Sequence, residues 1–319
     1  MLNLIKFILK RIAESVLLLL AITLIIFIAM KLTPNDAAVM LSGPEATEAD
    51  IESMRNYLGL NDPLHEQYFN YMENLLKGDL GTSYTTKQNV GDEILARLPN
   101  TINLAVAAMI FAMLVGIPFG VLASMKQNNF LDQTLTTASL VGISVPNFWL
   151  GSMLILVFSV LLGWLPTGGM TEPFWTPLGF KQAILPAIAL GLATAAQFTR
   201  IGRASMLDVL QSDYIRTADA KGLRNRRIYF IHAFRNALIP LLTVFGTSFG
   251  GLLGGAIVTE KVFVINGLGT YLIDAISRRN DPAVQSTVLV IAMMYVVVNL
   301  VIDILYVFVD PRISYEGKS

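Results

Sequence analysis

The sequence predicts an all-α, polytopic membrane protein with six transmembrane helices. Its 319 residues are 54% hydrophobic and only 14% charged, whereas soluble domains carry about 25% charged residues. Six segments are apolar and long enough to cross a hydrocarbon core about 30 Å thick, which needs roughly 20 helical residues. Cysteine is absent and there are two histidines, His65 and His232. This composition excludes disulfides and thiolate sites and leaves little material for a metal centre.

The six expected spans can be justified in chain order. Lys6, Lys10 and Arg11 precede the first span, as in a signal peptide, but its apolar run is too long for one and 33–36 is a poor cleavage site. We therefore expect a retained anchor. The third span contains Gly142, Pro146 and Gly151, so we expect a kink or break within it. The predicted spans are 12–30, 101–125, 134–165, 182–199, 236–259 and 283–309.

The distribution of basic residues predicts the orientation of the chain in the membrane. Eight of the 23 Lys and Arg residues lie between Arg200 and Arg235, in the segment that joins the fourth and fifth spans. Short loops rich in Lys and Arg stay on the cytoplasmic side. We therefore expect both chain ends and this segment to be cytoplasmic, with 14 basic residues inside and nine outside. The acidic segment 33–100, with 11 Asp and Glu residues, then lies outside.

Two short amphipathic helices are predicted in the outer segment. The first covers 48–58, with Thr47 as its N-cap and Gly59 as its stop, and the second begins after Pro63 and stops at Gly78. They form either a docking surface for an external partner or a cap over the protein's own spans, and the two readings are compatible. We divide the chain into a tip with the first span (1–32), this outer segment (33–96), a core of five helices (97–310) and a tail (311–319).

The inner segment predicts a short helix over 213–221, with Ser212 as its N-cap and Gly222 at C′. Tyr214, Ile215 and Ala218 share one face of this helix. A second helix is expected from near Asn225 toward Pro240. A basic helix with an apolar stripe is suited to contact a protein at the cytoplasmic face, and the alternative is a helix that lies on anionic lipid.

Small and polar residues within the spans give further candidates. Gly116 and Gly120 form a Gly-xxx-Gly pair that we assign to packing within the chain, because small residues let helices approach closely. The fifth span holds a larger set, which packs either within the chain or against a second subunit: Gly246, Gly250, Gly251, Gly254 and Gly255.

Charged and polar groups at membrane depth are few. We expect Glu14 to be neutralised by Lys10 and Arg11, and Asp303 to be structural, either reaching the interface or pairing with a basic residue of the inner segment. Polar side chains at plausible depth for a translocation path are Ser144, Asn147 and Gln197.

Motifs for catalysis fail on inspection. The chain ends in a Gly-Lys-Ser triplet, but Arg312 stands where a phosphate-binding loop needs its first glycine. His65 begins a zinc-protease pattern that Phe69 breaks. Residues 246–250 match the Gly-x-Ser-x-Gly pattern of the nucleophile elbow in hydrolases, but they lie inside an apolar span rather than at a strand-to-helix turn. We expect no enzyme and no cofactor, and the net charge of zero gives no reason to expect nucleic-acid binding.

Two classes of membrane protein can be compared with these features of the sequence. An ion-coupled secondary transporter often shows paired repeats and charged groups at the midplane, whereas the central spans here are nearly free of charge and show no clear repeat. A purely structural membrane protein does not need so elaborate an inner segment. Co-purification with an ATPase separates these classes.

Segments 214–222 (YIRTADAKG) and 232–240 (HAFRNALIP) resemble the cytoplasmic loop of binding-protein-dependent ABC importer permeases, and in particular their dipeptide, oligopeptide and nickel branch. The resemblance spans nearly the whole chain. It extends to 78–83 (GDLGTS), 144–151 (SVPNFWLG), 163–166 (GWLP) and 303–312 (DILYVFVDPR).

The resemblance implies a MetI-like fold in a bacterial plasma membrane, with the inner helix serving as a coupling helix for the ATPase subunits. The family signature is Glu-Ala-Ala, three residues, then Gly, whereas Arg216 and Thr217 replace the first two residues here. No role therefore passes through the missing glutamate. The residues assigned to coupling are Tyr214, Arg216, Thr217, Ala218, Asp219, Ala220, Lys221, Gly222 and Arg224.

The resemblance also implies partners and a substrate class. The partners are a second homologous permease, two ABC ATPase subunits, an extracytoplasmic substrate-binding protein and membrane lipid. Permeases of this branch carry dipeptides, oligopeptides, glutathione or nickel chelates. We favour peptides, because the spans contain no histidine or cysteine that would mark a metal path, and keep a nickel or other small-chelate importer as the alternative.

Overall fold

The computed structural model describes residues 2–32, 36–43, 45–224 and 227–309. Every regular element in these ranges is a helix, apart from one isolated bridge between Thr82 and Asn89. The predicted all-α fold class is confirmed. The predicted tail 311–319 lies outside the described residues. So does Asn225, near which the second helix of the inner segment was expected to begin.

Five helices in the described part of the chain are long and apolar enough to cross a membrane. Each contains one predicted span and extends beyond it. A π-helix, η2 (Ile228–Ala233), leads directly into the fourth of them. The five helices are α1 (Leu2–Leu32), α5 (Val90–Met125), α8 (Pro177–Leu210), α11 (Phe234–Val262) and α13 (Asp281–Val309).

The remaining predicted span, 134–165, is broken, as expected. It consists of α6 (Phe130–Ser144), α7 (Asn147–Leu154) and the π-helix η1 (Ile155–Leu161), with a bend of 103° between the two halves. The break falls at Pro146, because proline lacks an N–H and drives the preceding residue into an extended conformation. Gly142 and Gly151, which were also expected to weaken the span, lie inside α6 and α7.

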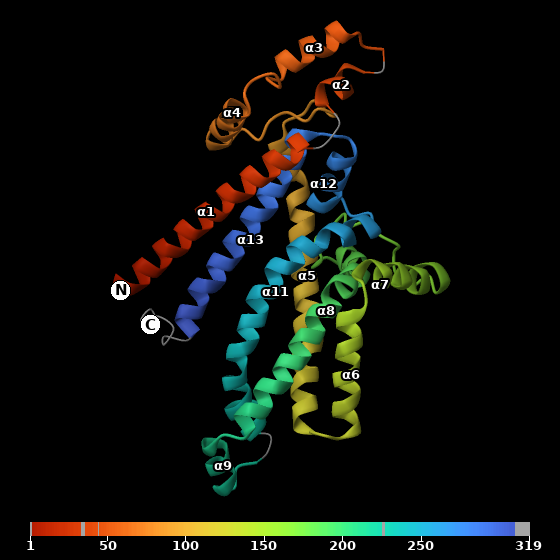
Figure 1. The fold of residues 1–319 in the computed structure, drawn as a ribbon. Coiled ribbons are helices and arrows are strands. Elements are labelled where there is room, and N and C mark those ends of the chain that lie inside the picture. The colour runs from red at the N-terminus through yellow and green to blue at the C-terminus, as the bar shows by residue number, and fades with distance from the viewer. Residues whose placement is uncertain (1, 33–35, 44, 225–226, 310–319) are drawn as a thin grey trace.

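The helices form a central group and two flanks (Figure 1). α5, α8 and α11 lie side by side at the centre, α6 packs on α8, and α1 and α13 lean away together on the other side. One end of the bundle carries α9, and the opposite end carries α2–α4 and α12. We refer to these as the α9 end and the α12 end.

α5 begins at Val90, eleven residues before the predicted span. Asn89 caps this helix by accepting a hydrogen bond from the N–H of Gly91 at 2.7 Å. Glu93 is buried beside Arg97 and accepts a hydrogen bond from Tyr271 at 2.7 Å. A charged first turn therefore enters the bundle, and α5 crosses the boundary that the sequence analysis draws between 96 and 97.

The packing of α5 on α8 depends on backbone approaching backbone. A Cβ atom on Gly120 would lie 2.7 Å from the carbonyl oxygen of Thr199, and one on Gly116 would collide with the carbonyl of Ala195. The hydroxyl of Thr199 donates to the Gly116 carbonyl at 3.2 Å. The expected role of Gly116 and Gly120 in packing within the chain is confirmed.

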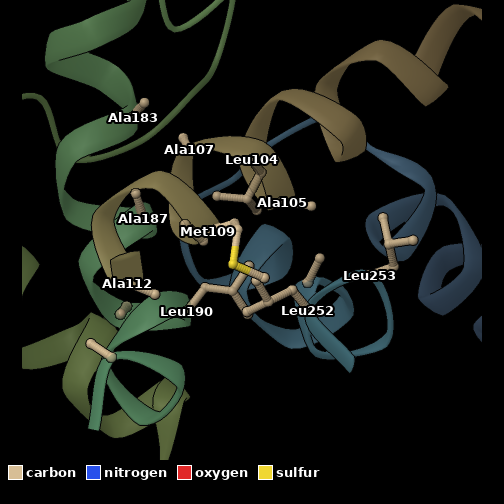
Figure 2. Close-up of a cluster of buried hydrophobic side chains, with 14 of the residues drawn as sticks. Leu104, Ala105, Ala107, Met109, Ala112, Ala183, Ala187, Leu190, Leu252 and Leu253 are labelled. Carbon is tan, nitrogen blue, oxygen red and sulfur yellow. The ribbon is translucent and has the colours of Figure 1, made fainter. Parts of the chain in front are cut away.

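Small and branched side chains fill the space around this contact. Figure 2 shows alanines of α5 and α8 facing each other, with leucines of α11 closing the cluster. The labelled members are Leu104, Ala105, Ala107, Met109, Ala112, Ala183, Ala187, Leu190, Leu252 and Leu253.

The two outer helices form as predicted. α3 (Glu48–Tyr57) begins with a capping box in which Thr47 and Asp50 exchange hydrogen bonds, and these bonds hold the pKa of Asp50 below its usual value. α4 (Leu64–Leu76) ends before Gly78, whose φ of +79° favours glycine. A further helix, α2 (Ala37–Ser42), was not predicted.

Aromatic contacts hold the outer segment on α1. The ring of Phe27 packs edge-on against Tyr68 with centroids 5.4 Å apart and stacks on Tyr71 at 6.5 Å. The hydroxyls of Thr23 and Tyr68 lie 3.1 Å apart and form a hydrogen bond. These contacts support the interpretation that the outer segment covers the protein's own spans.

An ion pair joins the two flanking spans. Asp303 lies 3.1 Å from Nε of Arg11, so its partner is on α1 and not in the inner segment, as one reading had it. α1 and α13 are neighbours, which brings the two groups together although 292 positions separate them in the sequence. The expected neutralisation of Glu14 by Lys10 and Arg11 is confirmed at 3.8 and 3.4 Å.

Gly116→Ala tests the contact between α5 and α8. Overpacking costs about 1–3 kcal/mol and the helix propensity of alanine returns up to about 1 kcal/mol, so we expect a net loss of stability. Thermal unfolding of the purified chain in detergent measures it. Gly251→Ala is the matched control, because its Cβ would meet no atom within 4 Å. Equal melting temperatures for the two variants would contradict the interlocked packing.

Candidate functional site

The short helix α9 (Asp213–Ala220) stands beyond the end of the spans, between α8 and η2 (Figure 1). Ser212 is its N-cap residue, as predicted, but no helix N–H donates to the Ser212 side chain. Its hydroxyl instead donates to the carbonyl of Val209 at 2.6 Å, which closes the end of α8. Gly222 follows the helix with φ +75°, and its N–H donates to the Asp219 carbonyl at 2.8 Å.

The apolar side of α9 faces the protein's own bundle. Ile215 is buried in a cluster that joins α5, α8, η2 and α11, and Ala218 packs against the same cluster. Tyr214 belongs to the predicted apolar face, yet it is 45% exposed. Its hydroxyl accepts a hydrogen bond of 2.6 Å from Nδ2 of Asn236, near the start of α11. α9 is therefore joined to α11 by one hydrogen bond, and it packs on an apolar cluster that α8, η2 and the start of α11 share.

The other side of α9 is polar and exposed. Arg216 forms an ion pair with Asp213 at 3.6 Å, but both side chains are largely in solvent, where such pairs contribute little. In the part of the chain that the structure describes, Lys221 and Arg224 form no ion pair within 4 Å. Besides Tyr214, the exposed members of the predicted coupling set are Arg216, Thr217, Asp219, Ala220, Lys221, Gly222 and Arg224.

The glycines of the fifth span divide into two groups. Cβ atoms on Gly246 and Gly250 would lie 2.5 Å from Ile302 and Tyr295 of α13, so these two glycines pack within the chain. A Cβ atom on Gly255 would lie 3.3 Å from the side chain of Leu190 on α8. Cβ atoms on Gly251 and Gly254 would meet nothing within 4 Å. This second group leaves a shallow surface of α11 open on the outside of the chain.

The three candidate path residues lie in different surroundings. Gln197 is half-buried on α8, and its Oε1 accepts a hydrogen bond from the Ser248 hydroxyl of α11 at 3.3 Å. Ser144 is exposed at the end of α6 and donates to the carbonyl of Leu140 at 2.9 Å. Asn147 is the first residue of α7. Among the described residues, no hydrogen bond joins Ser144 or Asn147 to Gln197.

Sequence reasoning missed a buried carboxylate at the end of α11. Glu260 lies one residue beyond the predicted end of the fifth span and is completely buried, in contact with the start of α12 (Leu268–Ser277). α12 itself was not predicted. The signal was present in the sequence, because an acidic residue at the end of an apolar span requires a partner, and Gly267 and Gly269 allow a close approach.

A bundle of membrane-spanning helices with a short helix beyond one end, in a basic segment, is typical of a multi-pass transport permease. The chain belongs to the family described as "Binding-protein-dependent transport system inner membrane component", whose model matches residues 116–315. A model for the N-terminal part of the same kind of membrane component matches residues 4–105. Together the two matches cover all of the chain except residues 1–3, 106–115 and 316–319.

Curated relatives extend over almost the entire chain. It is 42% identical to the oligopeptide transport system permease protein AppB of Bacillus subtilis, over 97% of this chain and 99% of that protein. It is 40% identical to the di/tripeptide permease protein DppB of Pseudomonas aeruginosa and to the glutathione permease protein GsiC of Escherichia coli, each over 98% of this chain and 99% of the relative. These relatives are transport permeases, and the chain is accordingly a non-catalytic membrane subunit.

The fold has a counterpart among solved structures. A chain of the MetNI methionine ABC transporter in an inward-facing conformation superposes with a TM-score of 0.58. The match covers 68% of this chain and 96% of that chain at 17% identity. The expected MetI-like fold is confirmed.

Tyr214→Phe tests the link between α9 and α11. Loss of the hydrogen bond to Asn236 removes about 1 kcal/mol, so backbone amides of 213–222 should exchange with deuterium roughly five times faster. Hydrogen exchange followed by mass spectrometry measures this. Arg216→Gln is the control, because it removes only an exposed ion pair and should change exchange less than twofold. The same acceleration in both variants would mean that Tyr214 does not fix α9.

Proposed function

We propose that the chain is the permease subunit of an ATP-driven importer and forms half of a translocation pathway for peptides. The observation that carries the proposal is the near full-length similarity, at about 40% identity, to permeases named for oligopeptides, di/tripeptides and glutathione. All three substrates contain peptide bonds and two charged ends. A nickel or small-chelate importer remains the alternative within the family, and an ion-coupled transporter the alternative outside it.

The α9 end is the cytoplasmic end in this proposal. Short basic loops remain on the cytoplasmic side of bacterial membranes, and eight of the 23 basic residues lie between Arg200 and Arg235. The start of α1 and the end of α13 lie together, away from α2–α4 (Figure 1), which is consistent with both chain ends being cytoplasmic.

Two ATPase subunits supply the energy, and one of these subunits binds α9. The exposed cations of α9 and of the turn that follows it, Arg216, Lys221 and Arg224, are available to pair with acidic groups of that partner. The apolar face of α9 is buried on η2 and α11, so a push on the exposed face is transferred to α11. Movement of a packed helix against its neighbours is the expected form of alternating access.

Gly222→Asp tests the coupling helix. The structure leaves space for a side chain at Gly222, with no atom within 4 Å of a Cβ, so the fold should persist and only a partner surface should be obstructed. In a deletion strain supplied with the binding protein and ATPases, wild type should restore uptake of labelled di- and oligopeptides but not of nickel. Gly222→Asp should reduce peptide uptake at least tenfold with normal membrane insertion.

Gly78→Asp is the matched control for this test. Gly78 also ends a helix, with φ +79° and no atom within 4 Å of a Cβ, but it lies at the α12 end. Both substitutions introduce similar backbone strain and the same charge, but only Gly222→Asp lies at the α9 end, so only Gly222→Asp should reduce the amount of ATPase that co-purifies with the permease. Normal uptake by Gly222→Asp would argue against the coupling role, and nickel uptake by wild type would overturn the peptide assignment.

A second, similar permease completes the pathway. The open surface around Gly251 and Gly254 is suited to it, because small residues permit close packing of helices in a membrane without a hydrophobic driving force. A substrate-binding protein delivers peptides at the opposite end, where α3 and α4 offer a docking surface. Membrane lipid covers the remaining apolar faces.

The double variant Gly251→Leu, Gly254→Leu tests the permease pair. The larger side chains have space within this chain, so its thermal stability should change by less than about 1 kcal/mol. Co-purification with the partner permease should fall severalfold. Gly246→Leu is the comparison, because it overpacks against Ile302 and should destabilise the chain itself. Undiminished pairing of the double variant would show that this surface is not the interface.

A further inference from the structure

The carboxylate of Glu260 is the meeting point of three helices. Its side chain is on α11 and is 0% exposed. Oε1 accepts a hydrogen bond of 2.6 Å from the hydroxyl of Thr101 on α5. Oε2 accepts hydrogen bonds from the N–H groups of Gly269 and Thr270, at 2.7 and 3.1 Å, in the first turn of α12. Both oxygens of the carboxylate are therefore used.

These hydrogen bonds make the carboxylate the cap of α12. The first N–H groups of a helix have no partner within the helix, and the N-cap residue of α12 is Gly267, which has no side chain to supply one. An acidic group at a helix N-terminus also interacts favourably with the helix dipole. Glu260 of α11 thus caps the N-terminus of α12, a role that a Ser or Asp at the N-cap position of the helix itself normally has.

Close packing surrounds the cap. A Cβ on Gly267 would collide with the Glu260 carboxylate, and one on Gly269 would collide with the backbone of Ile257. The hydroxyl of Thr101 donates to Glu260 and accepts a hydrogen bond from the N–H of Leu268 at 2.8 Å. α12 is therefore held against α11 by direct backbone approach, with Thr101 bridging the two.

Further contacts extend the connection across the α12 end. Tyr271 donates to Glu93 of α5, and burial, followed by this hydrogen bond, raises the pKa of Tyr271. The hydroxyl therefore remains a donor. The carbonyl of Phe263 accepts a hydrogen bond of 2.8 Å from Gly169. The turn after α11 consequently touches both α5 and the segment that precedes α8.

The other end of α11 contacts α9. Asn236 donates to Tyr214, as described above, and 24 residues of continuous helix separate Asn236 from Glu260. At 1.5 Å per residue the stretch from Asn236 to Glu260 is about 36 Å long. α11 therefore contacts the candidate coupling helix α9 at one end and α12 at the other.

We propose that Glu260 is a positioning residue that fixes α12 to the end of α11, so that a displacement of α9 reaches the opposite face of the permease. The inference rests on the proposed function, since it takes α9 as the element that the ATPases move. α12 then moves with α11 at the mouth of the pathway where substrate enters, and the Glu260 carboxylate is the joint between the two helices.

The test follows the two helices separately in the assembled importer, reconstituted with its partner permease, ATPases and binding protein. Spin labels are placed at Val258 on α11 and Ile276 on α12, each paired with a label at Leu114 on α5, because all three side chains are exposed. Pulsed electron resonance measures both distances with and without ATP and vanadate. In wild type, we expect both distances to shift when nucleotide is trapped.

Glu260→Gln should separate the two movements. Its amide has one acceptor oxygen in place of two and presents an NH2 group to donors, so it cannot cap α12 and accept from Thr101 together. We expect the Val258 distance to shift as in wild type and the Ile276 shift to be lost. Thr101→Val, which removes the bridging hydroxyl at similar volume, should reduce the Ile276 shift, whereas Thr101→Ser should preserve it.

The outcomes distinguish failure of the joint from failure of the proposed function. If Ile276 follows Val258 in Glu260→Gln and Thr101→Val as it does in wild type, the joint is refuted and the importer stands. The same holds if Val258 alone shifts in wild type. If neither distance in wild type responds to nucleotide while the ATPases remain active, then α9 does not transmit movement through α11. That result would refute the coupling role of α9 and the proposed function with it.

Discussion

The close approach of α5 to α8 is the contact on which the arrangement of the molecule depends. In a lipid environment apolar side chains gain nothing by leaving the solvent, so helices must associate through packing and hydrogen bonds. Gly116 and Gly120 on α5, and Gly191 on α8, each leave no space for a Cβ beside the facing backbone. This contact fixes α8 as the frame of the core, against which α6 and α11 also pack.

Because α8 is fixed along its length, the elements at its two ends have defined positions. Arg203, two turns before the end of α8, binds Asp132 of α6 through both carboxylate oxygens, one of them at 2.7 Å. α6 is thereby tied to the part of α8 that leads into α9, and the bend at Pro146 directs α7 away from the bundle. α9 packs on the end of α8 and on η2, and its hydrogen bond to Asn236 makes α11 the span that it contacts beyond the rigid frame.

The spans could be predicted from the sequence because length and hydropathy alone determine which segments suit a bilayer. Their ends could not, since charged residues enter the bundle wherever a distant partner neutralises them. Glu93 and Arg97 concealed the start of α5, although Tyr271, some 180 residues later, satisfies the glutamate. α12 was missed for a related reason, because its cap is a side chain of another helix. The position of Ser212 was predicted correctly, but its hydroxyl serves α8 rather than α9.

The glycines of α11 show most clearly where sequence reasoning stops. Gly246, Gly250, Gly251 and Gly254 offer overlapping small-residue pairs that are equivalent in the sequence, yet only the first two contact α13. One helix of α geometry turns 100° per residue, so neighbouring glycines such as Gly250 and Gly251 face different directions. Tyr295 and Ile302 decide which direction is filled within the chain. Only the folded bundle shows which face of α11 is left open. The face with Gly251 and Gly254 is the one on which a second subunit can approach α11, the helix that also carries Glu260.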